Sequence, residues 1–205
     1  MEVLNYIVKD RGIWMKYYRL VPFYKRDVYF HQDDQKNQIK AFEVESGMSF
    51  LITDSVYYKV DKLDKYVNKY DMLPSIGAPL ISLKLKRIIE EMSSDTCEFL
   101  PAIIESEKGE VNTDFFALNI KAFTDCFDEQ KSDFDMSNND PNKIGRIKSI
   151  YFNYSKIGQE HIYRMSIRPS MIIVSETFVE KYKKNRLKGL LFAKEGSRLR
   201  PEYLE

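Results

Sequence analysis

The chain has 205 residues, of which 43% are hydrophobic and 31% charged, an ordinary composition for a globular protein of one domain, or one and a half, with a sizeable core. Its formal net charge of +1 creates no overall field toward nucleic acid or a membrane, and it argues against a strongly acidic DNA mimic. Two cysteines without a CxxC pair, no secretory signal, and no apolar run near the roughly 18 residues of a membrane-spanning helix favour a reduced, cytoplasmic protein.

The first seventy residues predict β structure, because runs of β-branched and aromatic residues alternate with turn residues such as Gly12 and Pro22. The expected strands are Val3–Val8, Ile13–Leu20, Ile39–Val44 and Val56–Val60. The charged segment Asp61–Asp71 predicts a short helix or a loop. An aromatic content of 14% also favours a sheet-rich fold, with an adhesive binding surface as the alternative. We therefore expect an N-terminal β-rich region over residues 1–70, packed on a domain over residues 71–205.

A block then occurs twice, over residues 80–101 and 173–194, with a constant offset of 93 that places Ser82 on Ser175. Each copy has an apolar run, a serine, apolar residues at helical spacing, a polar break and a second apolar run. A serine before such a helix can accept from an unpaired backbone N–H, so both serines are expected to cap helices. Gly189 is expected at the turn into the last strand of the second copy. The block therefore predicts a duplicated strand–helix–strand unit that serves as scaffold.

Further strands are expected between the two copies. Phe115–Ile120 predicts one strand, and Ile147–Tyr154 and His161–Ile167 predict a hairpin with Gly158 in its turn. Together with the short helices, these strands predict an α+β fold of mostly antiparallel sheets.

An acidic stretch precedes the expected hairpin. Asp125 and Asp128 are three residues apart and could share a helical face, so one hypothesis is a metal-dependent enzyme that uses Asp125, Asp128 and Asp133. The alternatives are a solvated acidic loop and a charged rim that meets a basic partner. The residues expected at such a rim are Asp125, Asp128, Glu129, Asp133 and Asp135. Asp125 and Ser132 are also candidates for bracing a turn, since Asp and Ser side chains bond locally to backbone.

Other candidate residues favour structural roles. His31 and His161 stand apart from any metal-ligand spacing, and the sequence has no P-loop, GxGxxG or GxSxG motif. A basic set near the C-terminus lacks the patterns of nucleic-acid-binding domains and predicts the solvated face of a helix. It comprises Lys181, Lys183, Lys184, Arg186, Lys188, Arg198 and Arg200. The leading expectation is therefore no catalytic residue, no metal, no cofactor and no nucleic-acid partner.

Seven sequence segments occur in a fixed order over about residues 71–193. They are PLISLKLKRIIEE, CEFLPAII, FFALNI, DCFDEQKSDF, GRIKSIYFN, EHIYRMS and IIVSETFVEKYKKNRLKGLLF. This ordered set resembles a bacterial family of immunity proteins from polymorphic toxin systems, often numbered immunity family eleven. The paired Asp and the Ser of that family's Asp-x-x-Asp-x-x-x-Ser segment are matched by Asp125, Asp128 and Ser132. The chain departs from the family pattern at Glu176, where Asp is usual, and at Lys188, where Thr is usual.

The resemblance implies a non-enzymatic inhibitor. Such proteins are encoded beside a toxin and protect the producing cell and its kin by binding that toxin, so the implied partner is a cognate toxin encoded nearby. Inhibition of this kind needs affinity and selectivity but no reactive group, which agrees with the missing catalytic motifs. The identity of the toxin, and whether the protein forms a homodimer, are left open.

Overall fold

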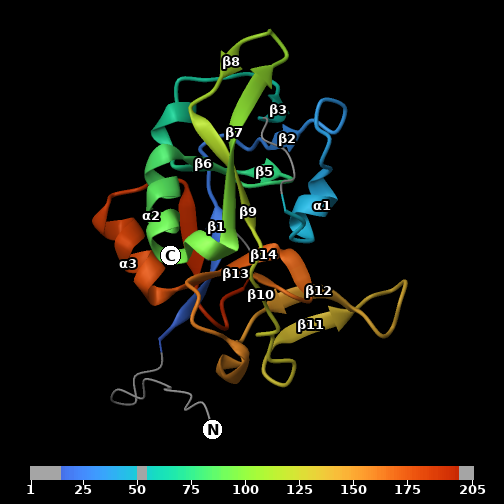
Figure 1. Cartoon of the computed structure of the whole chain (residues 1–205). Helices are drawn as coiled ribbons and strands as arrows, with labels where there is room; N and C mark the ends of the chain where they lie inside the picture. The colour runs from blue at the N-terminus through green and yellow to red at the C-terminus, as the bar shows by residue number, and fades with distance from the viewer. Residues whose placement is uncertain (1–14, 50–54, 199–205) are drawn as a thin grey trace, which may run out of the picture.

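The computed structural model describes residues 15–49 and 55–198, which form two main sheets, a separate hairpin and short helices (Figure 1). The predicted strand Val3–Val8 and the first residues of Ile13–Leu20 lie outside the described residues. The predicted strands Val56–Val60 and Phe115–Ile120 are both present.

One sheet has five strands, which come from the beginning, the middle and the end of the described chain. They are β1 (Tyr17–Pro22), β10 (Phe123–Thr124), β13 (Ile162–Met165), β14 (Arg168–Ser175) and β15 (Leu190–Ala193). Their order is β10-β13-β14-β1-β15, and all neighbours are antiparallel except β10 and β13. The N-terminal strand β1 therefore lies between two strands from far along the chain.

The other sheet has eight strands. They are β2 (Phe30–Gln32), β3 (Val56–Val60), β4 (Met72–Leu73), β5 (Ser75–Ile76), β6 (Leu80–Ser82), β7 (Cys97–Ser106), β8 (Val111–Asn112) and β9 (Phe115–Ile120). Their order is β4-β6-β9-β7-β3-β2-β5, with β8 paired to β7 off this path. Only β2–β5 and β3–β7 are parallel among these pairings, so the predicted α+β class with mostly antiparallel sheets is confirmed.

A two-stranded hairpin, β11 (Asp133–Met136) with β12 (Ile144–Ser149), stands apart from both sheets. It extends away from the body of the molecule, at the opposite end from β8 (Figure 1). Three short 3₁₀ helices complete the described chain: η1 (Val67–Lys69), η2 (Ser94–Thr96) and η3 (Tyr154–Lys156).

Helices α2 (Leu83–Ser93) and α3 (Glu176–Lys184) lie side by side and share one core (Figure 1). Helix α2 buries residues at positions i, i+3 and i+4, and helix α3 buries residues at positions i, i+1 and i+4. Both spacings place the apolar side chains on one face of the helix. The buried residues in this core cluster are Leu85, Ile88 and Ile89 on α2, and Phe178, Val179 and Tyr182 on α3. The two helices therefore join the two sheets through a common apolar layer.

The two copies of the repeated block follow the same path through different sheets. In β6–α2–β7 the outer strands are both antiparallel to β9, which lies between them. In β14–α3–β15 the outer strands are both antiparallel to β1, which likewise lies between them. The origin of the two units by duplication stays a prediction.

A serine stands at the start of each of these helices. Ser82 Oγ accepts from the N–H of Leu85, and Ser175 Oγ accepts from the N–H of Phe178, both at 3.2 Å. Each serine thereby satisfies one of the backbone donors that the first turn of a helix leaves unpaired.

The segment Ile39–Val44 is not a strand, and that prediction is wrong. Residues Ala41–Glu45 form helix α1, and Glu43 Oε2 accepts from the backbone N–H of Lys40 at 2.7 Å. This carboxylate stabilises the start of the helix, while Val44 alone among its residues is buried. The prediction also missed strand β2, which begins at the buried Phe30.

The expected hairpin around Gly158 is also wrong. Strand β12 pairs with β11, and β13 pairs with β14 on one side and β10 on the other. Between them the chain turns through η3, where Asn153 Oδ1 accepts from the N–H of Ser155 at 3.2 Å. Alternating apolar residues predict strands but do not specify which strands pair with one another.

Candidate functional site

Asp128 organises the start of the acidic segment, in the connection between β10 and β11. Its Oδ1 accepts from the backbone N–H groups of Gln130 and Lys131 at 3.1 and 3.2 Å, and its Oδ2 lies 2.9 Å from Lys131 Nζ. The hydrogen bond from the Lys131 ammonium is the main cause that lowers the pKa of the Asp128 carboxyl. Asp128 therefore holds the turn through its own side chain.

Ser132 ties this turn to the segment that follows β12. Its Oγ accepts from the N–H of Tyr151 at 2.9 Å, and the N–H of Asp128 donates to the carbonyl of Tyr151 at 3.0 Å. The expectation that Ser132 braces a turn agrees with this geometry. The same expectation for Asp125 is wrong, because its exposed carboxylate pairs at 3.6 Å with the side chain of Lys156 and, among the described residues, accepts no hydrogen bond from turn backbone.

A small cavity of about 380 Å³ opens beside the turn. Its lining residues are Asp125, Phe127, Asp128, Glu129, Gln130, Asn153 and Lys156. Asp125 and Glu129 are exposed there, while Asp128 is engaged in the turn. The structure thus brings three of the five predicted rim residues to one concave surface.

The other two rim residues lie on the projecting hairpin. Asp133 and Asp135 alternate along β11, so both side chains face the same side, where Lys148 of β12 lies between them. Lys148 Nζ is 3.5 Å from Asp133 Oδ1 and 2.6 Å from Asp135 Oδ1. Hydrogen bonding to Asp135 is the main cause that raises the pKa of Lys148. All three side chains are widely exposed, so these charges remain available to a partner.

The geometry required for a metal-dependent site differs from what these residues adopt. The connection that contains Asp125 and Asp128 is a turn, so the prediction that they share a helical face is wrong. Within residues 15–49 and 55–198, no three His, Cys, Asp or Glu side chains are grouped so as to hold a metal ion. Asp125, Asp128 and Asp133 therefore do not form such a group.

The two histidines have different surroundings. His161 Nδ1 lies 2.8 Å from Ser175 Oγ, the same hydroxyl that caps α3. Partial burial lowers the pKa of His161, the nearby Lys181 adds to this effect, and Glu160 opposes it. His31 instead lies on the exposed side of β2.

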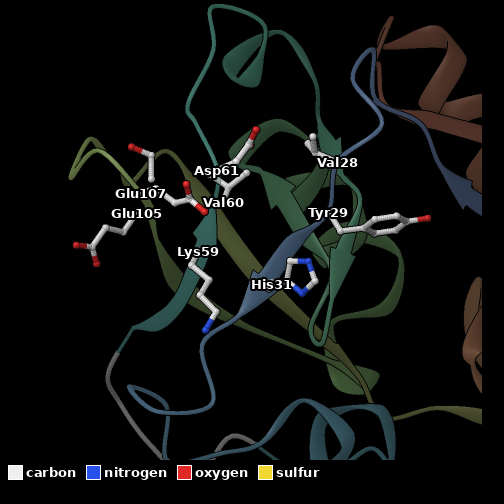
Figure 2. A pocket seen from close by; sticks show the side chains of 9 residues that line it. Val28, Tyr29, His31, Lys59, Val60, Asp61, Glu105 and Glu107 are labelled. Carbon is white, nitrogen blue, oxygen red and sulfur yellow. The ribbon is translucent and has the colours of Figure 1, made fainter.

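A larger open groove of about 610 Å³ surrounds His31, and the sequence analysis did not predict it (Figure 2). Its lining residues are Val28, Tyr29, His31, Lys59, Val60, Asp61, Glu105, Ser106 and Glu107. Lys59 points along one side of the groove, and the carboxylates of Asp61 and Glu107 lie on another (Figure 2). The alternation of exposed Lys59 with buried Tyr58 and Val60 was the available signal for this open face.

Asp71 links the two repeated units. Its Oδ1 accepts from Ser82 Oγ at 2.7 Å, and its Oδ2 accepts from the N–H of Lys188 at 2.8 Å. Gly189 follows with a φ of +105°, and a Cβ at that position would lie 2.3 Å from the carbonyl oxygen of Met72. One carboxylate thus connects the helix cap of the first unit to the turn between α3 and β15 in the second.

The basic set near the C-terminus is spread over several environments. Lys181, Lys183 and Lys184 lie in the last turn of α3, where positive charge suits the helix dipole. Lys181 Nζ also pairs with Glu91 of α2 at 2.9 Å. Arg200 lies outside the described residues.

Comparison with known families decides the wider classification. The family model described as Immunity protein family (Imm11) matches residues 21–197. The chain belongs to this immunity protein family. The match confirms the resemblance found in the second half and extends it over most of the first seventy residues, including β2 and β3. Family membership indicates a toxin-neutralising role.

No curated protein matches the chain. No helix among the described residues is both long and apolar enough to cross a membrane.

Proposed function

We propose that this protein is a cytoplasmic, non-catalytic immunity protein that binds a cognate toxin encoded nearby and neutralises it by steric occlusion. The observation that carries the proposal is the family match over residues 21–197. An inhibitor of this kind acts by covering the toxin's active site or its substrate path. A standard protein interface, which buries about 1,600 Å² in total, is sufficient for this.

The acidic segment is the proposed contact with the toxin. Exposed carboxylates on a projecting hairpin can approach a partner before the body of the protein does, and complementary charge speeds association and selects among partners. The proposed contact residues are Asp125, Glu129, Asp133 and Asp135. Asp128 and Ser132 support them by holding the turn in one conformation.

Co-expression with the product of the adjacent gene tests the function. The adjacent product should arrest growth when expressed alone, and this protein should restore growth and co-purify with it. A product that is harmless alone, or that this protein does not bind, contradicts the proposal.

Charge reversal tests the acidic segment separately. The double variant Asp133→Lys, Asp135→Lys should lose toxin binding but keep the melting temperature of the wild type, because both side chains are exposed. A control variant, Glu91→Lys with Glu180→Lys on the exposed sides of α2 and α3, changes the net charge equally at a different place. Loss of folding in the hairpin variant would instead assign these residues a bracing role.

A further inference from the structure

An open row of side chains crosses the eight-stranded sheet at its far end from the hairpin. His31 of β2 pairs with Ile76 of β5 and with Lys59 of β3. Lys59 in turn pairs with Glu105 of β7, and Glu105 pairs with Val111 of β8. The five residues therefore stand side by side on neighbouring strands, in the order Ile76, His31, Lys59, Glu105 and Val111. We call them the cross-strand row.

The two faces of the sheet differ sharply at this place. The residues that alternate with the row, Phe30, Tyr58 and Ile104, are at most 1% exposed and belong to the core. At the ends of the row, Ile76 and Val111 are 48% and 58% exposed. Since successive side chains of a strand point to opposite faces, the sheet has one packed side and one open side here. Ile76 and Val111 therefore lie on the open face of the sheet, and the core on the other face is packed without them.

The row has the length of a recognition segment. Neighbouring strands are spaced about 4.8 Å apart, so four steps span about 19 Å. That distance accommodates roughly 13 residues of α-helix, which rises 1.5 Å per residue. The row is therefore suited to one helical or extended segment of a partner rather than to a whole domain surface.

The groove along the row is predominantly acidic. Its lining contains three carboxylates, those of Asp61, Glu105 and Glu107, against the single ammonium of Lys59. The Lys59 charge is itself partly offset by Asp33, whose Oδ1 lies 3.9 Å from Lys59 Nζ. The charge that this surface offers to a partner is therefore negative.

The existing ion pairs leave these carboxylates accessible. Glu105 pairs with Lys36, whose side chain is also widely exposed, and such a pair contributes little net free energy. Asp61, half-exposed, pairs with Arg26, which also pairs with Asp64. In the part of the chain that the structure describes, no cation pairs with Glu107. A basic partner would therefore replace Lys36 in its weak ion pair with Glu105 and supply a cation to Glu107.

We infer that the cross-strand row docks a basic segment of the toxin, with Lys or Arg side chains against Glu105 and Glu107 and apolar side chains against Ile76 and Val111. This inference rests on the proposed function, because it identifies a second surface on which the same toxin is held. The row lies on the eight-stranded sheet, whereas the acidic hairpin β11–β12 stands apart from that sheet (Figure 1), so each can be altered without touching the other. The partner is recognised here by positive charge flanked by apolar residues.

The test uses the full-length chain and the purified product of the adjacent gene. The variant Glu105→Lys, Glu107→Lys should weaken binding by at least about tenfold, chiefly through a slower association rate that depends less on salt. Binding constants and rates at low and high salt provide the measurement. The single variant Glu107→Lys, which breaks no ion pair between described residues, repeats the test where folding is not at risk.

The outcomes separate the inference from the function on which it rests. Wild-type affinity in both row variants, with the toxin still bound by the wild type, overturns the inference and leaves the proposed function standing. A similar loss in the Glu91→Lys, Glu180→Lys control also overturns it, because net charge alone would then explain the effect. A wild-type protein that does not bind the toxin overturns both.

Discussion

The two strand–helix–strand units begin their helices in the same way but complete the cap differently. In the first unit the hydroxyl of Ser82 donates to the carboxylate of Asp71, which also accepts from the second unit. In the second unit Ser175 Oγ lies beside His161, the residue immediately before β13. The serine determines the local cap, whereas the second partner of its hydroxyl comes from elsewhere in the chain. Equivalent substitutions in the two units should therefore have unequal effects.

The largest expected difference in unfolding free energy between the two units comes from the buried side chains of the helices that the serines cap. Phe178→Ala should cost about 3–5 kcal/mol and Leu85→Ala about 2–5 kcal/mol of unfolding free energy, because each leaves a cavity in the shared core. Phe178 should be the more costly because its ring also packs edge-on against Phe192, with centroids 6.3 Å apart. Denaturant titration measures both, with exposed Leu83→Ala as the control. A smaller loss for Phe178→Ala than for Leu85→Ala would contradict the comparison.

Gly189 has no counterpart in the first unit, where the equivalent position is Thr96. Gly189→Ala should cost at least about 1–3 kcal/mol, since its positive φ is strained for alanine and the new Cβ would meet the Met72 carbonyl oxygen. Gly109→Ala is the matched control, because Gly109 has a φ of +79° but nothing within 4 Å of a Cβ. Thermal melts of the two variants separate the contact from the backbone strain. Equal losses would show that the close approach to Met72 has no energetic consequence.

The caps themselves are expected to differ by less. Removal of an N-cap hydroxyl typically costs about 0.5–2 kcal/mol. Ser175→Ala should lie at the upper end of that range, because Ser175 is fully buried and water cannot replace its hydroxyl. Ser82→Ala should lie at the lower end, because Ser82 is half-buried and Asp71 keeps its hydrogen bond from Lys188. Chemical denaturation of the two single variants orders them, and the reverse order would refute the explanation.

The smallest expected effect is a pH dependence confined to the second unit. Burial lowers the pKa of His161 below the unfolded value of about 6.5, so the folded state binds fewer protons than the unfolded chain. Its contribution to stability is therefore complete above about pH 6.5 and is lost as the pH falls through the lower folded pKa. His161→Gln should flatten the dependence of unfolding free energy on pH over this interval. A slope that persists unchanged in the variant would assign it to other groups.

Local sequence predicted helices α2 and α3, their serine caps and the strands Val56–Val60 and Phe115–Ile120. Serine followed by apolar residues at helical spacing is a signal contained within about ten residues, and α2 and α3 both follow it. The pairing of β12 with β11 was missed because partner choice depends on burial that only the folded chain defines. Segment Ile39–Val44 was misassigned because one carboxylate, that of Glu43, stabilises a helix despite β-favouring neighbours.

The candidate binding surfaces were likewise predictable from the sequence only in part. The acidic residues were visible in the sequence as a cluster, but their separation into a braced turn and an exposed hairpin was not, since it depends on contacts with Tyr151 and Lys148. The cross-strand row could not be found from sequence at all. Its five members come from five strands, and only the register of those strands brings them together.

The position of β1 between β14 and β15 determines when the five-stranded sheet can form during protein synthesis. A ribosome releases β1 early, yet its two neighbours, β14 and β15, belong to residues 168–193. Strand pairing across so long a loop is slow, and a nascent chain keeps at least one edge of β1 open until β15 has been translated. A chain interrupted before β15 lacks a strand of the five-stranded sheet, and one interrupted before Lys188 also lacks the link to Asp71. Any protection that this protein gives must therefore lag behind its translation by the time the last strand needs to dock.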